Sequence, residues 1–104
     1  MDDQVTVYRV TMLDFAYRDL DGIYEYIANT LMEPRVALGI VDDIEAAILS
    51  LDILPQRCPE RKIGAYAGQG YRQLFVGNYT VLFRIDEESK LIVVVTIRYS
   101  SSQF

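Results

Sequence analysis

The stretch "YRQLFVGNYTVLFRIDEESKLIVVVTIRY", residues 71–99, holds three runs rich in β-branched and aromatic residues, separated by two short breaks. The first break, Gly77 and Asn78, tolerates the positive φ angles of a tight hairpin turn, and the second is a charged turn. The last run is apolar on both faces for most of its length, which is typical of a central, covered strand. We therefore predict consecutive antiparallel strands over residues 71–76, 79–85 and 91–99.

The first half of the chain shows helical periodicity. Apolar residues recur every three or four positions in two segments, the period of one helical face. The first helix is predicted over residues 13–31, and the second begins at Pro34 and continues to about Leu51. Because only a few residues separate them, we expect an antiparallel helical hairpin. A short strand is predicted before the hairpin, over residues 5–10.

These elements define the fold class. Prolines and glycines break residues 55–70 into a long loop, in which a short strand is predicted around residues 62–66. The expected order is β-α-α-β-β-β: an α+β domain with the antiparallel helical hairpin packed on a small, twisted, mainly antiparallel sheet. A length of 104 residues fits one core, so residues 1–104 are predicted to form a single domain.

Composition excludes several classes of site. The chain has no histidine and a single cysteine, which rules out histidine-based catalytic triads, the usual zinc sites and an internal disulfide. The net charge of −5 argues against strong nonspecific attraction to nucleic acid. The acidic start "MDDQ" is unlike a secretory signal, and no apolar run is long enough for a membrane span, so a cytoplasmic protein without a membrane partner is expected.

Positive charge is concentrated in the second half of the chain, so any anion site is expected there. Arg72, Arg84 and Arg98 fall one on each predicted strand, and Arg61 and Lys62 precede them in the loop. On one sheet face, such residues could clamp a phosphate or a nucleic-acid backbone, with tyrosines stacking on bases. The alternative is that each arginine pairs with one of the many Asp and Glu side chains.

Other reactive side chains point less clearly to chemistry. The acidic residues of both predicted helices have the spacing of a solvated face, and no metal-ligand loop is visible, so neither a metal nor a cofactor is expected. Cys58 has Arg57 and Arg61 nearby, which would lower the pKa of a thiol, but it has no histidine partner.

Nearly the whole chain resembles the RelE/ParE superfamily, the plasmid stabilisation toxins of type II toxin-antitoxin (addiction) systems. The resemblance rests on the "A..DL..IYEYI" pattern in residues 16–27, on "GYRQLFVGNYTVLFRIDEE" in residues 70–88, and on a last strand with an aromatic residue and a short polar tail. It implies the fold predicted above and growth inhibition by a toxin that a cognate antitoxin neutralises. Members of the superfamily either cleave mRNA on the ribosome or poison DNA gyrase.

The resemblance also implies site residues. Arg72 matches the strand arginine that contacts the scissile phosphate in RelE-like and YoeB-like nucleases, and Arg98 and Tyr99 resemble the arginine-tyrosine pair near the YoeB C-terminus. Ser100 stands where YoeB has its catalytic histidine. Arg61 and Lys62 are the only equivalents of the upstream RelE lysines, and Glu60 is an unaligned stand-in for a glutamate base.

Three functions therefore stay open. One is a ParE-like toxin that acts by binding DNA gyrase, which needs a surface but no catalytic residue. Another is a ribosome-dependent mRNA endoribonuclease that uses Arg72, Arg98 and Tyr99. The last is an inactive, toxin-derived module that binds only its antitoxin. The expected partners are a cognate antitoxin and either gyrase or the ribosome with mRNA, in a homodimer or a toxin-antitoxin hetero-oligomer.

Overall fold

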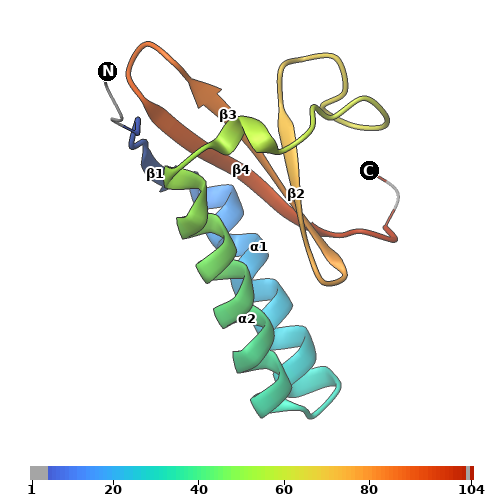
Figure 1. The fold of residues 1–104 in the computed structure, drawn as a ribbon. Helices are drawn as coiled ribbons and strands as arrows, with labels where there is room; N and C mark the ends of the chain where they lie inside the picture. Colours follow the sequence, from blue (N-terminus) through green and yellow to red (C-terminus); the bar gives the residue numbers. More distant parts are fainter. Residues whose placement is uncertain (1–4, 103) are drawn as a thin grey trace.

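The computed structural model describes residues 5–102 and 104, which form a helical hairpin against a four-stranded sheet (Figure 1). A π-helical turn (Tyr26–Thr30) ends the first helix, and two 3-10 turns (Ser50–Asp52 and Pro55–Arg57) follow the second. The regular elements are β1 (Arg9–Met12), α1 (Asp14–Glu25), α2 (Pro34–Leu49), β2 (Arg72–Val76), β3 (Tyr79–Asp86) and β4 (Leu91–Tyr99). No described helix is both long and apolar enough to span a bilayer.

The sheet has the order β1-β4-β3-β2. β1 runs parallel to β4, whereas β3 is antiparallel to both β4 and β2. The predicted α+β class is confirmed, with its helical hairpin, its element order and its mainly antiparallel sheet. The three consecutive strands lie within one residue of their predicted bounds.

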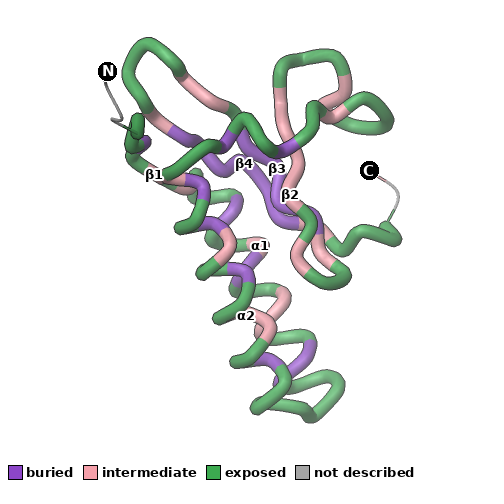
Figure 2. The backbone as a smooth tube through the Cα atoms, in the orientation of Figure 1, coloured by how far each residue is buried: buried purple, intermediate pink, exposed green. Residues whose placement is uncertain are grey.

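Each face of the sheet has its own cover, because side chains alternate between the faces along a strand. On one face, β3 and β4 contribute Val81, Phe83, Ile92 and Val94 to a core shared with α1 and α2. On the other face, a smaller cluster around Leu82, Val93 and Val95 is covered by tyrosines of the loop and by Phe104. Figure 2 shows the resulting burial, highest in the central strands and on the inner side of the helices.

The first strand lies further along the chain than predicted. Residues 5–10 have strand composition, but the strand is Arg9–Met12, because the chain reaches β4 only where the Arg9 amide donates to the Lys90 carbonyl. Before that point, Val7 forms an isolated bridge to Ile53 and stays exposed. The strand predicted around residues 62–66 is also wrong, since that segment forms turns with Gly64 and Tyr66 at positive φ.

Asp19 of α1 completes the edge of β4. β1 pairs with β4 only as far as Val94, so beyond that residue the edge has no strand partner. The Asp19 carboxylate accepts hydrogen bonds there from the Ile97 amide at 3.0 Å and from the Thr96 hydroxyl. A helix side chain thus replaces the missing strand and links the hairpin to the sheet. The spacing of the acidic residues predicts a solvated helix face, and for Asp19, one of these residues, that prediction is wrong.

We predict that Asp19→Ala lowers the free energy of unfolding by about 1–3 kcal/mol, because it leaves the buried Ile97 amide without an acceptor. Urea denaturation measures the change. Asp21→Ala, at an exposed position of the same helix, is the matched control and should change stability little. Equal losses in both variants would contradict the role of Asp19 at the strand edge.

A polar cluster fastens the β3–β4 turn to the start of the chain. The Tyr8 hydroxyl donates to Glu87 Oε1 at 2.7 Å. Gln56 Nε2 donates to the Tyr8 oxygen at 2.7 Å and to Glu87 Oε2 at 2.9 Å, and Lys90 Nζ lies 3.6 Å from the same carboxylate. Three distant segments therefore meet at one carboxylate, Glu87.

The hydrogen bonds from Tyr8 and then from Gln56 lower the pKa of Glu87, and Lys90 adds a smaller effect. The stabilisation from Glu87 is therefore present above the unfolded pKa of about 4.3 and is lost as pH falls through the lower folded value. We expect Glu87→Gln to be less stable than the parent near neutral pH and the difference to shrink in acid. Denaturant titrations across this pH range test it, and a pH-independent difference would contradict it.

Candidate functional site

The three strand arginines do not share one face of the sheet. Arg72 pairs with Phe83 and so lies on the face that carries the helices. Its Nη1 donates to the Cys58 carbonyl at 2.6 Å and, more weakly, to the Gln56 carbonyl at 3.4 Å. Arg72 therefore fastens the loop after α2 to the beginning of β2.

Arg84 and Arg98 lie on the opposite face. Arg84 is exposed and pairs with Val93, whereas Arg98 pairs with Thr80, four positions further back along β3. Four strand positions correspond to about 13 Å. Arg98 donates from Nε to the Thr96 hydroxyl, so its charge stays at the free edge of β4, away from Arg84.

Arg61 is the most highly connected cation of this opposite face. Its Nη2 donates to the Phe104 carbonyl at 2.7 Å, its Nη1 to Gln73 Oε1 at 3.2 Å, and its Nε to the Ala65 carbonyl at 3.2 Å. The guanidinium carbon also lies 4.4 Å from the centre of the Phe104 ring. The loop, β2 and the segment after β4 thus converge on one side chain.

Next to Arg61 the surface is hollowed into a pocket of about 420 Å³. Lys62 and Glu60 are exposed there, and the Glu60 backbone forms an isolated bridge to Arg72. The structure brings these two residues together with Arg61 and places Arg98 on the same face. The lining consists of Pro59, Glu60, Arg61, Lys62, Ile63, Gln73, Phe75 and Phe104.

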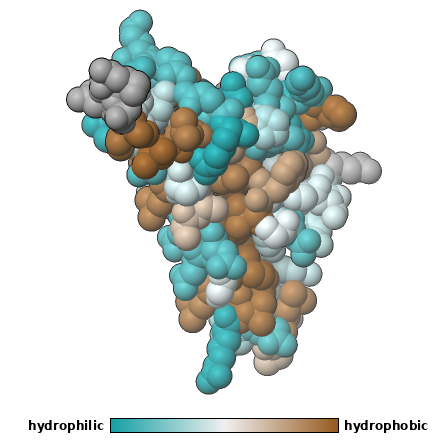
Figure 3. Space-filling model, viewed as in Figure 1, coloured by the Kyte–Doolittle hydropathy of each residue, from teal (hydrophilic) through white to brown (hydrophobic). Residues whose placement is uncertain are grey.

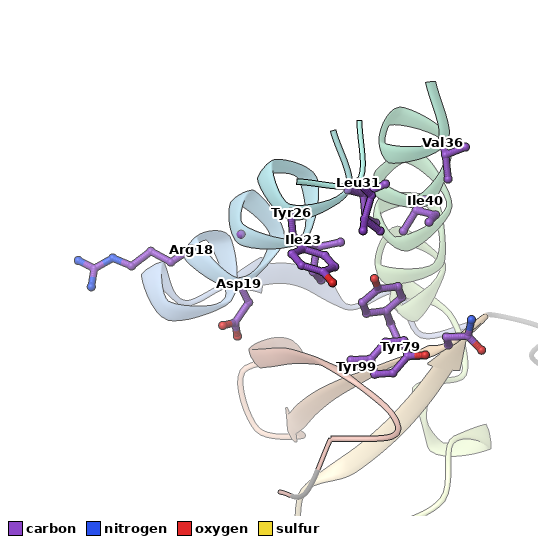
Figure 4. A pocket seen from close by; sticks show the side chains of 12 residues that line it. Arg18, Asp19, Ile23, Tyr26, Leu31, Val36, Ile40, Tyr79 and Tyr99 are labelled. Carbon is purple, nitrogen blue, oxygen red and sulfur yellow. The ribbon is translucent and has the colours of Figure 1, made fainter. Parts of the chain in front are cut away.

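Tyr99 faces the other way, into a groove between the helical hairpin and the end of the sheet. The groove has a volume of about 790 Å³ and is lined largely by apolar side chains of both helices. In Figure 4 the hairpin residues Tyr26 and Ile23 lie across the groove from Tyr79 and Tyr99, with Leu31, Val36 and Ile40 further along. The rings of Tyr79 and Tyr99 meet edge to face at 5.5 Å.

The groove combines apolar walls with tyrosine hydroxyls and is also lined by Arg18 and Asp19. Burial raises the pKa of Tyr79, and Tyr99 and Tyr26 raise it further, so this phenol stays protonated at neutral pH and can donate a hydrogen bond. Apolar side chains are also visible along the hairpin in Figure 3. Such a groove can receive the apolar face of another helix.

Ion pairs contribute little to the pocket beside Arg61 or to the groove. Within residues 5–102 and 104, the one ion pair joins Lys90 to Glu87. Arg72 and Arg98 donate to a carbonyl and a hydroxyl oxygen rather than to carboxylates. The same part of the chain contains no cluster of His, Cys, Asp and Glu that could hold a metal ion. Burial raises the pKa of the Cys58 thiol despite Arg57 and Arg72 nearby, which disfavours the reactive thiolate.

Sequence reasoning missed two residues that shape these regions. The sequence assigns no role to Phe104, in the tail after the last strand, yet its ring lies near the guanidinium groups of Arg61 and Arg98. Asp19, described above, lines the groove. The basic pair Arg61 and Lys62, close to a glycine-rich loop, indicated the pocket beside Arg61. The apolar residues of the predicted helices indicated hydrophobic surface on the hairpin, but not the groove that it forms with the end of the sheet.

Comparisons with known proteins agree with this fold. The family model described as "ParE toxin of type II toxin-antitoxin system, parDE" matches residues 10–104. The chain is similar in structure to the chromosomal ParDE system from P. aeruginosa, with a TM-score of 0.73, 24% identity and coverage of 90% of this chain and 97% of that one.

A second similar structure is the toxin-antitoxin complex RelBE2 from Mycobacterium tuberculosis, with a TM-score of 0.64 and 25% identity. It covers 97% of this chain and 100% of that chain. Compared by sequence with curated proteins, the chain matches none of them. Because the family model spans almost the whole fold described above, the chain belongs to the ParE toxin family of type II toxin-antitoxin systems.

Proposed function

We propose that this toxin acts by binding DNA gyrase and does not cleave RNA. One observation carries the proposal: the residues of the expected nuclease site lie on different faces of the sheet. Arg72 and Tyr99 are on the helix side, whereas Arg98 is on the opposite side. Arg72 is also level with Val94 of β4, four strand positions or about 13 Å from Arg98, so these two arginines do not meet around one phosphate.

The contacts of these side chains support the same proposal. RNA cleavage by 2'-hydroxyl attack needs a proton acceptor, a proton donor and positive charge around one phosphate. Arg72 donates to a loop carbonyl, and Tyr99 packs edge to face against Tyr79 in the groove. Both side chains therefore have structural partners. Inhibition by binding needs only a complementary surface, which the pocket beside Arg61 and the groove can provide.

The purified protein is expected to inhibit supercoiling by DNA gyrase, and its induction in cells should leave mRNA without new cleavage ends. A supercoiling assay beside primer extension measures both effects. New cleavage ends with fully active gyrase would overturn the proposal in favour of the endoribonuclease. If neither effect appeared while the antitoxin still bound, the chain would be an inactive antitoxin-binding module.

We also propose that the groove between the hairpin and the sheet receives the cognate antitoxin. The similar structures come from toxin-antitoxin systems, which supports an antitoxin partner for this chain. The groove is open and apolar, and Leu31 and Val36 at its far end are half exposed. An amphipathic helix would bury these side chains and could accept the Tyr79 hydrogen bond.

Val36→Glu is expected to weaken antitoxin binding at least about tenfold, because it places a charge in a desolvated contact. The matched control is Leu38→Glu on the same helix. Leu38 is 53% exposed, against 49% for Val36, but it does not line the groove. Titration calorimetry with the antitoxin measures both affinities. Equal weakening by the two substitutions would place the antitoxin elsewhere.

A further inference from the structure

Phe104 is held on the sheet by two arginines at once. The guanidinium carbon of Arg61 lies 4.4 Å from the ring centre, and that of Arg98 lies 5.4 Å from it. Both distances are within the range of cation-π attraction. The ring also packs against the apolar cluster formed by Leu82, Val93 and Val95. The Phe104 ring therefore packs on aliphatic side chains and also contacts two cations.

The backbone of Phe104 is bound as well as its ring. Its carbonyl oxygen accepts from Arg61 Nη2 at 2.7 Å, while Gln73 Oε1 and the Ala65 carbonyl accept from the other nitrogens of the same guanidinium. The planar Arg61 guanidinium is thus oriented by hydrogen bonds to the loop and to β2. It contacts both the ring and the oxygen of a single residue.

Gly64 leaves the space that this arrangement needs. A side chain at Gly64 would collide with the Phe104 carbonyl oxygen and come within 3.0 Å of Arg61 Nη2. Gly68, in the same loop, has a similar positive φ, yet a side chain there would meet nothing. Close approach by Phe104 is therefore specific to position 64.

We propose that Arg61, Gly64, Gln73 and Arg98 form a binding site for an aromatic amino-acid residue together with its adjacent acceptor oxygen. In this structure Phe104 is the resident ligand. The ligand class is that of the resident group, since the bound ring and the bound oxygen both belong to Phe104. The site would accept a protein segment that presents an aromatic side chain next to an acidic group, in place of Phe104.

A carboxylate of such a segment would accept a charge-assisted hydrogen bond from the Arg61 guanidinium. Lys62 and the exposed Ile63 and Phe75 line the adjoining pocket and extend the surface available to such a segment. The proposal concerns the sheet face opposite the hairpin and stands whether or not the chain acts on gyrase.

The experiment follows the reaction of Arg61 with phenylglyoxal, measured by peptide mass spectrometry, with Arg57 as internal reference. Phe104→Ala should make Arg61 react severalfold faster, and Phe104→Tyr should keep the slow rate. Adding N-acetyl-L-phenylalanine to the Phe104→Ala protein should restore the slow rate, and N-acetyl-L-alanine should not. The amide of the first probe should protect less than the free acid.

Gly64→Ala and Gly68→Ala provide an independent pair of variants, because both place a side chain at a positive φ but only the first meets Phe104. The first should raise the reactivity of Arg61 and the second should leave it unchanged. Unchanged reactivity in both Phe104→Ala and Gly64→Ala, or no protection by the aromatic probe, would overturn the proposal. Protection by a single-stranded oligonucleotide alone would overturn it in favour of a nucleotide site.

The supercoiling assay on the same variants separates this proposal from the proposed function. Protection of Arg61 from phenylglyoxal measures occupancy of the site itself and does not depend on whether the protein binds gyrase. Faster modification of Arg61 in Phe104→Ala, reversed by the aromatic probe, supports the site even if gyrase is unaffected. Inhibition of gyrase without any change in Arg61 reactivity overturns the site and leaves the proposed target standing.

Discussion

The structure depends on the burial of β4 on both faces. This strand pairs with a neighbour on each side, and its side chains contribute to the hairpin core and to the smaller cluster on the opposite face. Because β1 is short, part of one β4 edge would be left without partners, and the Asp19 carboxylate supplies them. The hairpin is therefore fastened to the sheet by a polar contact at the same place where the groove begins.

The two faces consequently present different chemistry. The hairpin side offers a largely apolar groove that contains the Tyr79 hydroxyl, a hydrogen-bond donor. The opposite side offers guanidinium groups beside aromatic rings, in a chain whose net charge is −5. Since β4 separates them, both surfaces can be occupied at once. An antitoxin could cover the groove while the cationic face stays accessible, and in that case neutralisation would require more than filling the groove.

Sequence patterns predicted the layers well, because helical and strand periodicities record which side chains are buried. They misplaced the first strand, since composition does not show where residues 5–10 meet a partner. Strand positions did not reveal the faces of the arginines either, because a shift of one residue in register reverses the face. The contacts of Asp19 and Phe104 join residues far apart in the chain, and no local pattern records such contacts.

The parallel pairing of β1 with β4 has a consequence for folding. Arg9 pairs with Leu91, so the first strand cannot take its place until almost the entire described chain has been synthesised. Contacts between such distant residues carry a large loop-closure cost and slow the folding of a domain. The hairpin can form early from local contacts, but its apolar face then lacks the sheet that covers it. During synthesis, side chains such as Leu20, Ile44 and Ile48, which the sheet covers in the folded protein, would be exposed to any chaperone or partner present.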